Sequence, residues 1–324
     1  LMDNGYIQTA KAYILYRDQR SRSREMNTRL MKIYGDITYT AAKDSDIKRE
    51  NANIDGDTAM GSMLKFGSEG AKQFYDMFVL KPEHARAHRE GDIHIHDLSM
   101  LTGYCAGWSL KQLIQEGLGG ISGKITSAPA AHLSVLCNQM VNFLGIMQNE
   151  WAGAQAFSSF DTYLAPFVKV DNLTYREVKK CIEAFIYGVN TPSRWGTQAP
   201  FSNITLDWTV PADLAELPAI VGGKEMDFKY KDCKKEMDMV NRAFLEIMIE
   251  GDANGRGFQY PIPTYSITRD FDWSDTENNR LLFEMTAKYG TPYFSNYINS
   301  DMEPSDVRSM CCRLRLDLRE LRKK

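Results

Sequence analysis

The chain has 324 residues, of which 43% are hydrophobic and 25% are charged, a balance typical of a globular protein with a substantial core. The net charge is −3 at pH 7. This disfavours a nucleic-acid-binding protein, because such proteins normally carry an excess of basic residues. No apolar run approaches the roughly 20 residues that a membrane-spanning helix needs. The six cysteines are not spaced as in a disulfide-bonded scaffold, which favours a reducing cytoplasm and leaves thiols for chemistry.

Apolar residues recur at helical spacing in several segments. The expected helices cover residues 6–34, 68–79, 131–149 and 233–250. Two more helices are expected to begin with capping boxes, at Thr174–Glu177 and at Ser274–Glu277. The second of these is expected to end at Gly290, because glycine is favoured just past a helix C-terminus.

Short extended segments are expected between the helices. They cover residues 202–208, 260–268 and 293–298. Long helices that alternate with short strands predict the α/β class, in one or two domains. Periodicity alone does not decide whether the sheet closes into a barrel.

The segment Asp92–Asp97 alternates strictly, which predicts a strand with His94 and His96 on one side. A His-x-His pair on a strand can begin a metal site. Only His132 follows this pair, however, and a hydrolase site needs further imidazoles. The favoured interpretation is therefore that the two rings line a pocket or form hydrogen bonds in the core.

Two segments contain cysteines of interest. Cys105 lies just past the histidine segment, among small and aromatic residues, and an isolated cysteine is most often a buried apolar side chain. Cys311 and Cys312 are adjacent, so they cannot both face the same way along an extended chain. Pro304 predicts a short helix that ends near Met310, which places Cys312 on a loop.

Several segments together resemble the class III, anaerobic ribonucleoside-triphosphate reductases. In chain order they are Gly91–Leu98, Tyr104–Trp108, Ala154–Phe157 with Phe160–Asp161, Asn190–Arg194, Phe258–Thr264 and Ser309–Leu314. The resemblance runs from about residue 20 to the end, and the Met-Cys-Cys-Arg-Leu-Arg-Leu sequence from Met310 is its most specific part.

The resemblance implies a fold and a domain organisation. Residues 1–20 look like the end of an ATP-cone regulatory domain, and residues 21–324 look like the N-terminal part of the catalytic domain, including its cysteine loop. The implied fold is the glycyl-radical-enzyme type of α/β barrel, in which helices surround two half-barrels, present here only in part. The chain begins at Leu1 and ends at Lys324 in a charged run, so both ends are expected to be cuts through a longer protein.

The implied activity is reduction of ribonucleoside triphosphates to deoxyribonucleotides by thiyl-radical chemistry, with formate as reductant. Cys312 matches the cysteine that carries the thiyl radical and abstracts hydrogen from C3′ of the ribose. Cys105 matches the cysteine on the opposite face, which donates hydrogen as the 2′-hydroxyl leaves. His96, and with it His94, are expected to line the formate and ribose pocket. The family's glycyl radical and structural zinc site are expected beyond Lys324, so this chain alone is not expected to turn over.

Two turns, Gly251–Gly257 and Thr191–Ser202, are expected either to present backbone N–H groups to the triphosphate or to be ordinary loops. The implied partners are a second copy of the protein, an iron–sulfur activating enzyme that uses S-adenosylmethionine, and ATP and deoxynucleotide effectors. The helix at 131–149 is expected to contact the second subunit, with Asn138, Gln139 and Asn142 forming hydrogen bonds either across the dimer or to an effector. Effectors are expected to bind around residues 124–150.

Three alternatives remain open. A glycyl-radical lyase would share the barrel but normally has another cysteine-loop sequence. A non-catalytic nucleotide-binding regulatory module would explain residues 1–20 but not the cysteines. A metal-dependent hydrolase is opposed by the number of histidines.

Overall fold

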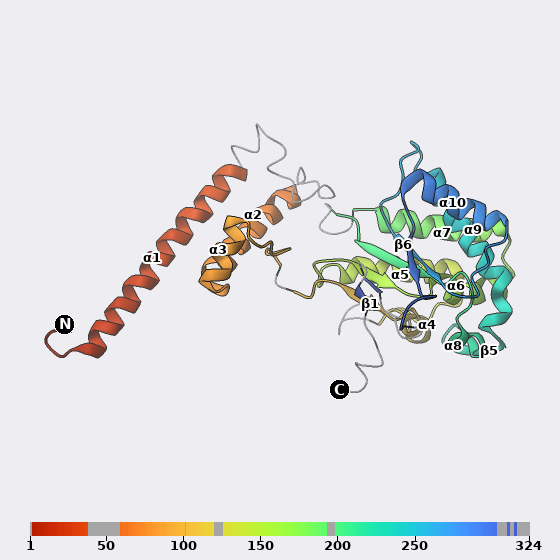
Figure 1. The fold of residues 1–324 in the computed structure, drawn as a ribbon, viewed down its shortest axis with the longest axis horizontal. Coiled ribbons are helices and arrows are strands. Elements are labelled where there is room, and N and C mark those ends of the chain that lie inside the picture. Colours follow the sequence, from red (N-terminus) through yellow and green to blue (C-terminus); the bar gives the residue numbers. More distant parts are fainter. Residues whose placement is uncertain are drawn as a thin grey trace. The chain divides into compact units, whose positions relative to one another are not determined.

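The structure is a computed structural model that describes residues 2–37, 59–100, 102–119, 126–192, 198–302, 310–311 and 314–315. The chain divides into two compact units (Figure 1). The first comprises Leu1–Leu101 with Trp195–Gln198, and the second comprises Thr102–Arg194 with Ala199–Lys324.

The first unit is helical. Its elements are α1 (Ile7–Gly35), α2 (Ala59–Phe74), the π-helix η3 (Tyr75–Val79) and α3 (Pro82–Glu90). The C-terminal part of α1 packs on α2 and η3: Arg29 donates hydrogen bonds of 2.7 Å to Gln73 and 3.2 Å to Asp76, and Tyr34 meets Phe66 edge to face. The predicted helix at 6–34 is confirmed, and the one at 68–79 is confirmed in part, since α2 begins nine residues before Ser68.

The predicted strand at Asp92–Asp97 is wrong. Helix α3 ends at Gly91, which adopts the left-handed conformation, and the next two backbone N–H groups both bond to the carbonyl oxygen of Ala87. This ties the following segment to the end of α3. Asp97 also has a positive φ of 48°, so the segment forms turns rather than a strand.

The second unit contains a five-stranded parallel sheet with the order β1-β2-β3-β6-β7. Its strands are β1 (Ala106–Trp108), β2 (Gln155–Phe157), β3 (Ser202–Leu206), β6 (Ile262–Ile267) and β7 (Tyr293–Asn296). All three predicted extended segments contain one of these strands. The sequence did not predict β1 and β2, nor the antiparallel hairpin of β4 (Pro218–Val221) and β5 (Lys224–Lys229).

Helices connect these strands and pack on one face of the sheet (Figure 1). They are α4 (Leu110–Glu116), α5 (Leu133–Met147), α6 (Phe160–Val170), α7 (Tyr175–Asn190), α8 (Ala212–Ala215), η4 (Tyr230–Cys233), α9 (Lys234–Glu250) and α10 (Glu277–Tyr289). The predicted helices at 131–149 and 233–250 are confirmed, and so is the capping box at Thr174–Glu177, in which a Glu177 carboxylate oxygen accepts from the Thr174 backbone N–H at 2.8 Å.

The predicted capping box at Ser274 is wrong by two residues. The backbone N–H of Ser274 donates to Asp272 in a turn, and the N-cap is Thr276, whose hydroxyl accepts from the Asn279 N–H at 3.2 Å. The predicted end of α10 at Gly290 is confirmed, with the glycine in the left-handed conformation at φ 67°.

Glu246 on α9 joins this helix to α7. Its carboxylate lies 2.9 Å from Lys179 Nζ on α7 and 2.8 Å from Arg242 Nε, one turn earlier on α9. Burial alone would raise the pKa of Glu246, but hydrogen bonds from Arg242 and Lys179 outweigh it and lower the pKa from 4.5 to about 2. The stabilisation is therefore complete above pH 4.5 and is lost as the pH falls from 4.5 toward 2.

Replacing Glu246 by glutamine is expected to lower the free energy of unfolding by about 1–2 kcal/mol at pH 7 and by much less at pH 3. Urea unfolding of the chain at both pH values measures this difference. Glu250→Gln is the matched control, since Glu250 also pairs with Lys179 but its side chain is 60% exposed; a change below about 0.5 kcal/mol is expected there. Equal losses at both pH values in Glu246→Gln would assign the effect to packing instead.

Candidate functional site

The parallel sheet has two chemically different faces. The register pairs Ile204 with Pro263 and Leu206 with Tyr265, and these residues alternate with polar ones along each strand. The face that packs on the helices is mostly apolar, with Phe157, Ile204, Leu206, Tyr265 and Ile267 in the main core. The opposite face, called the polar face below, carries hydroxyl and amide groups from three strands. They belong to Asn203, Thr205, Thr264, Ser266 and Ser295.

Cys105 stands at the amino end of this polar face, directly before β1. It is half-buried and packs with Ala154, Ala156 and Phe201 in a small cluster separate from the main core. Gly153 approaches it so closely that an added Cβ would lie 2.9 Å from Cys105 Sγ. The thiol therefore packs against alanines, a glycine and Phe201 on the face away from the helices, as a group that acts on a ligand there would need to do.

The segment that contains the other candidate cysteine is described only in part. Met310–Cys311 (β8) and Leu314–Arg315 (β9) pair as antiparallel strands, and β8 lies beside β1, β2 and β3. These strands exclude a continuous helix from Met310 to Arg315. Cys312 lies outside the described residues, as does Pro304, so the loop position of Cys312 and its distance from Cys105 stay predictions.

The two predicted histidines are in contact in the first unit. The ring centroids of His94 and His96 lie 4.6 Å apart, and His88 on α3 lies 5.6 Å from His94. His88 Nδ1 also accepts a 3.3 Å hydrogen bond from the Ile95 backbone N–H. Sequence reasoning missed His88, because nothing in the spacing indicated that the chain folds back on α3. Nowhere in the described segments does a group of three or more His, Cys, Asp or Glu side chains form a possible metal site.

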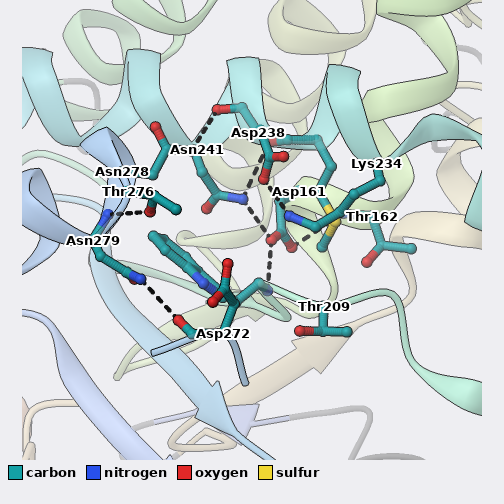
Figure 2. A network of polar contacts seen from close by, with 12 residues as sticks. Asp161, Thr162, Thr209, Lys234, Asp238, Asn241, Asp272, Thr276, Asn278 and Asn279 are labelled. Atoms are coloured by element: carbon teal, nitrogen blue, oxygen red, sulfur yellow. Dashed lines mark hydrogen bonds and ion pairs between the residues drawn. The ribbon is translucent and has the colours of Figure 1, made fainter. Parts of the chain in front are cut away.

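Asp161, at the start of α6, forms a polar network among the described residues of the second unit (Figure 2). It is fully buried, and its carboxylate accepts four hydrogen bonds. The donors are the backbone N–H groups of Thr162 at 3.0 Å, Asp207 at 2.8 Å and Trp208 at 2.9 Å, and the side-chain amide of Asn241 at 2.9 Å. Burial raises the pKa of Asp161, and these N–H donors oppose the increase. Asp161 thus fixes the turn after β3 to α6 and α9, away from the polar face.

The glycine-rich turn after α9 does not offer its N–H groups to a phosphate. The Asp252 carboxylate accepts from the backbone N–H groups of Asn254 at 2.8 Å and Arg256 at 2.9 Å, and the N–H of Gly255 bonds to the Asp252 carbonyl oxygen. These hydrogen bonds lower the pKa of Asp252 and leave the turn internally satisfied. The structure therefore opposes the expected triphosphate site at Gly251–Gly257. In the other predicted turn, residues 193–197 lie outside the described chain.

A cavity of about 440 Å³ lies at the carboxyl ends of β3, β6 and β7. Its lining includes three carboxylates, those of Asp207, Asp213 and Asp270, and one guanidinium, that of Arg269. Ligands often bind at this edge of parallel sheets. The excess of carboxylates, however, disfavours a triphosphate, so the cavity is an unsuitable place for the anionic end of a nucleotide.

A second cavity of about 330 Å³ lies between α5 and α7, with Asn138 and Lys180 in its lining. Helix α5 is exposed on this side of the described chain, where Val135 is 41% and Ile146 is 47% exposed. Asn138 and Asn142 bond to each other on the exposed face. Gln139 does not share that face: it is buried and donates to Ser127 and Ala128, so its predicted contact with a partner is wrong.

The sequence profile of one family, anaerobic ribonucleoside-triphosphate reductase, matches residues 50–324. The anaerobic ribonucleoside-triphosphate reductases of Escherichia coli and Salmonella typhimurium are each 27% identical to the chain over 227 residues, which cover 62% of this chain and 31% of each relative. A crystal structure of the Thermotoga maritima anaerobic ribonucleotide reductase in complex with dATP and CTP superimposes with a TM-score of 0.60 at 19% identity. It covers 91% of this chain, and the chain spans 52% of it.

The fold and the sequence profile together define the class. The chain is an α/β protein with the barrel type of fold found in these reductases, and it contains only part of that barrel. The chain belongs to the anaerobic ribonucleoside-triphosphate reductase family. The resemblance stated from the motifs and the α/β class are both confirmed. Among the described helices, none is long and apolar enough to cross a membrane.

Proposed function

We propose that the complete protein reduces ribonucleoside triphosphates to deoxyribonucleoside triphosphates by thiyl-radical chemistry, with formate as the reductant. Family membership supports the reaction class. The observation that carries the proposal is the position of Cys105 at the amino end of the polar face, together with β8, which contains Cys311 and lies beside the first three strands of the sheet.

The proposed roles of the two thiols are those that the family resemblance implies. A glycyl radical, outside this chain, would supply the unpaired electron that Cys312 uses as a thiyl radical. Cys312 takes the C3′ hydrogen of the ribose, and Cys105 gives a hydrogen from the other side as the 2′-hydroxyl leaves as water. Overall, one ribonucleotide, one formate and one proton give one deoxyribonucleotide, one carbon dioxide and one water. A buried face keeps water and oxygen from the radical.

His96, with His94 beside it, is proposed to orient the formate carboxylate. An imidazole can donate a hydrogen bond to a carboxylate and can take part in proton transfer. Among the described residues the ring contacts between His88, His94 and His96 hold the three rings as one group.

The partners are proposed from exposed surfaces. The exposed apolar side of α5 suits contact with a second subunit. The cavity beside α7 suits a deoxynucleotide effector, because its lining combines apolar side chains with the ammonium group of Lys180, which can pair with a phosphate. A relative from Thermotoga maritima has been crystallised with dATP in its specificity site. The first half of α1, with Tyr13 and Tyr16 exposed, suits packing in an ATP-cone domain that ends near residue 20.

Other expected components remain proposals as well. An S-adenosylmethionine-dependent iron–sulfur enzyme would generate the radical, and a structural zinc site would lie in a part of the protein outside this chain. A cytoplasmic location agrees with the free thiols of four cysteines, Cys105, Cys137, Cys181 and Cys233. A glycyl-radical lyase is opposed by family membership, and a non-catalytic regulatory module gives no reason for a thiol on the polar face.

Formate dependence can be tested in the full-length protein after anaerobic activation. With a ribonucleoside triphosphate and carbon-labelled formate, we expect one labelled carbon dioxide for each deoxyribonucleotide. Omitting formate and adding a dithiol should reduce the rate to background. Equal rates with the dithiol would reject formate as the reductant, and no deoxyribonucleotide under any condition would reject the proposed reaction.

A further inference from the structure

We infer that the cavity at the carboxyl ends of β3, β6 and β7 binds a small aliphatic diamine through its carboxylate and hydroxyl groups. The cavity lies at the opposite end of the sheet from Cys105, and no motif of the sequence pointed to it. Its ligand need not take part in the proposed reaction.

The charge of the cavity determines the sign of the ligand. The lining contains the carboxylates of Asp207, Asp213 and Asp270 against one guanidinium, that of Arg269. Asp207 is only 5% exposed, and a charge that is largely removed from water acts strongly on a ligand beside it. The excess of carboxylates therefore favours a ligand with positive charges and hydrogen-bond donors.

Asp270 is held in place before any ligand arrives. The Thr268 hydroxyl donates a 2.5 Å hydrogen bond to its carboxylate, and the Thr209 hydroxyl donates a 3.3 Å hydrogen bond to its backbone carbonyl oxygen. The second bond joins the turn after β3 to the turn after β6. The stacked rings of Trp208 and Phe271, with centroids 5.5 Å apart, join the same two turns. A carboxylate fixed in this way loses little freedom when it binds a ligand.

Ser266 gives independent evidence for a ligand. This β6 residue lines the cavity and is only 2% exposed, yet its hydroxyl forms no hydrogen bond with any residue in the described part of the chain. A hydroxyl that is buried without a partner costs free energy, and a hydrogen-bond donor of a ligand in the cavity would remove that cost. An ammonium group is such a donor.

The size and the composition of the lining favour an aliphatic diamine over an ion or a nucleobase. A volume of about 440 Å³ is in the range of small-molecule sites. The described carboxylates of the cavity do not converge as a metal site would require, because no such group of three exists in the described residues. Two ammonium groups on one flexible chain can instead reach carboxylates that lie apart. Tyr297 is the only aromatic residue among the described lining residues, which leaves little surface for a base to stack on.

The test is calorimetric titration of the full-length protein at fixed ionic strength with 1,4-diaminobutane, 1-aminobutane and magnesium chloride. We expect the diamine to bind with a dissociation constant below about 1 mM. The monoamine should bind about 10-fold more weakly, because it lacks one of the two charge-assisted hydrogen bonds. Magnesium should not compete with the diamine.

Two substitutions of opposite charge test the site itself. Asp270→Asn should weaken diamine binding about 5-fold, because it removes an attracting charge. Arg269→Gln should strengthen binding about 2-fold, because it removes a repelling one. Both residues are exposed, so neither change should prevent folding.

The matched control is Asp272→Asn, which removes the same charge from an exposed residue two positions further along the chain and outside the lining. It should leave the dissociation constant of the diamine unchanged. Equal weakening in Asp270→Asn and Asp272→Asn would assign the binding to general surface charge and overturn the inference. Competition by magnesium, weaker binding in Arg269→Gln, or a wild-type dissociation constant above about 10 mM would overturn it as well.

Discussion

Replacing Asp161 by alanine is expected to destabilise the chain by about 3–5 kcal/mol, because it leaves buried hydrogen-bond donors without an acceptor. Three of the four donors are backbone N–H groups, and they belong to the start of α6 and to the turn after β3 (Figure 2). The fourth is the amide of Asn241 on α9, whose carbonyl oxygen accepts a 3.1 Å hydrogen bond from the Tyr265 hydroxyl on β6. One carboxylate thus joins four elements of the second unit.

Urea unfolding of the chain measures the effect, with Asp238→Asn as the control. Asp238 is on the same helix as Asn241, but its side chain is 47% exposed and pairs with Lys234 at the surface. A change below about 0.5 kcal/mol is expected there. If Asp161→Ala cost no more than this control, water would have to satisfy the four donors, and the turn after β3 would not depend on Asp161.

Helices α5, α7, α9 and α10 of the second unit were predicted from an apolar stripe or a terminal signal, whereas α4, α6 and α8 were not predicted. Helix α9 ends at Gly251 and α10 at Gly290, and the α7 capping box is formed as predicted. The strands β1 and β2 were not predictable, since each has three residues, too few to show a period. Asp92–Asp97 shows the opposite error: its alternation was real, but the chain is held in turns by the end of α3.

The candidate site was predictable only in part. The motif around Cys105 pointed to a residue that lies at the end of the polar face, whereas the polar residues of that face lie on strands distant in sequence. Asn203 and Thr205 alternate with Ile204 and Leu206, a pattern of two chemically different faces of β3 that the sequence analysis did not use. It did not indicate which strands are neighbours, because that depends on the parallel crossovers, and these are not encoded locally.

The largest expected effect on activity concerns the two cysteines. In the activated full-length protein, both Cys312→Ala and Cys105→Ala are expected to lower deoxyribonucleotide formation at least about 1,000-fold, because each removes a hydrogen carrier that the proposed reaction requires. The two lesions nevertheless act at different steps. Without the Cys312 thiol, hydrogen cannot leave C3′, whereas without Cys105 it can leave but the reduction at C2′ has no donor.

Isotope exchange separates the two steps. With substrate labelled at C3′, loss of label to the solvent is expected to vanish in Cys312→Ala and to persist in Cys105→Ala, where the thiyl radical still forms and the thiol exchanges its hydrogen with water. Cys311→Ala is the matched control, since Cys311 is adjacent in sequence and lies in β8; it should retain both exchange and reduction. If Cys312→Ala still reduces substrate while Cys311→Ala does not, the radical belongs to Cys311. If Cys105→Ala reduces substrate at the wild-type rate, the polar face near Ala154 and Ala156 does not hold the second hydrogen donor.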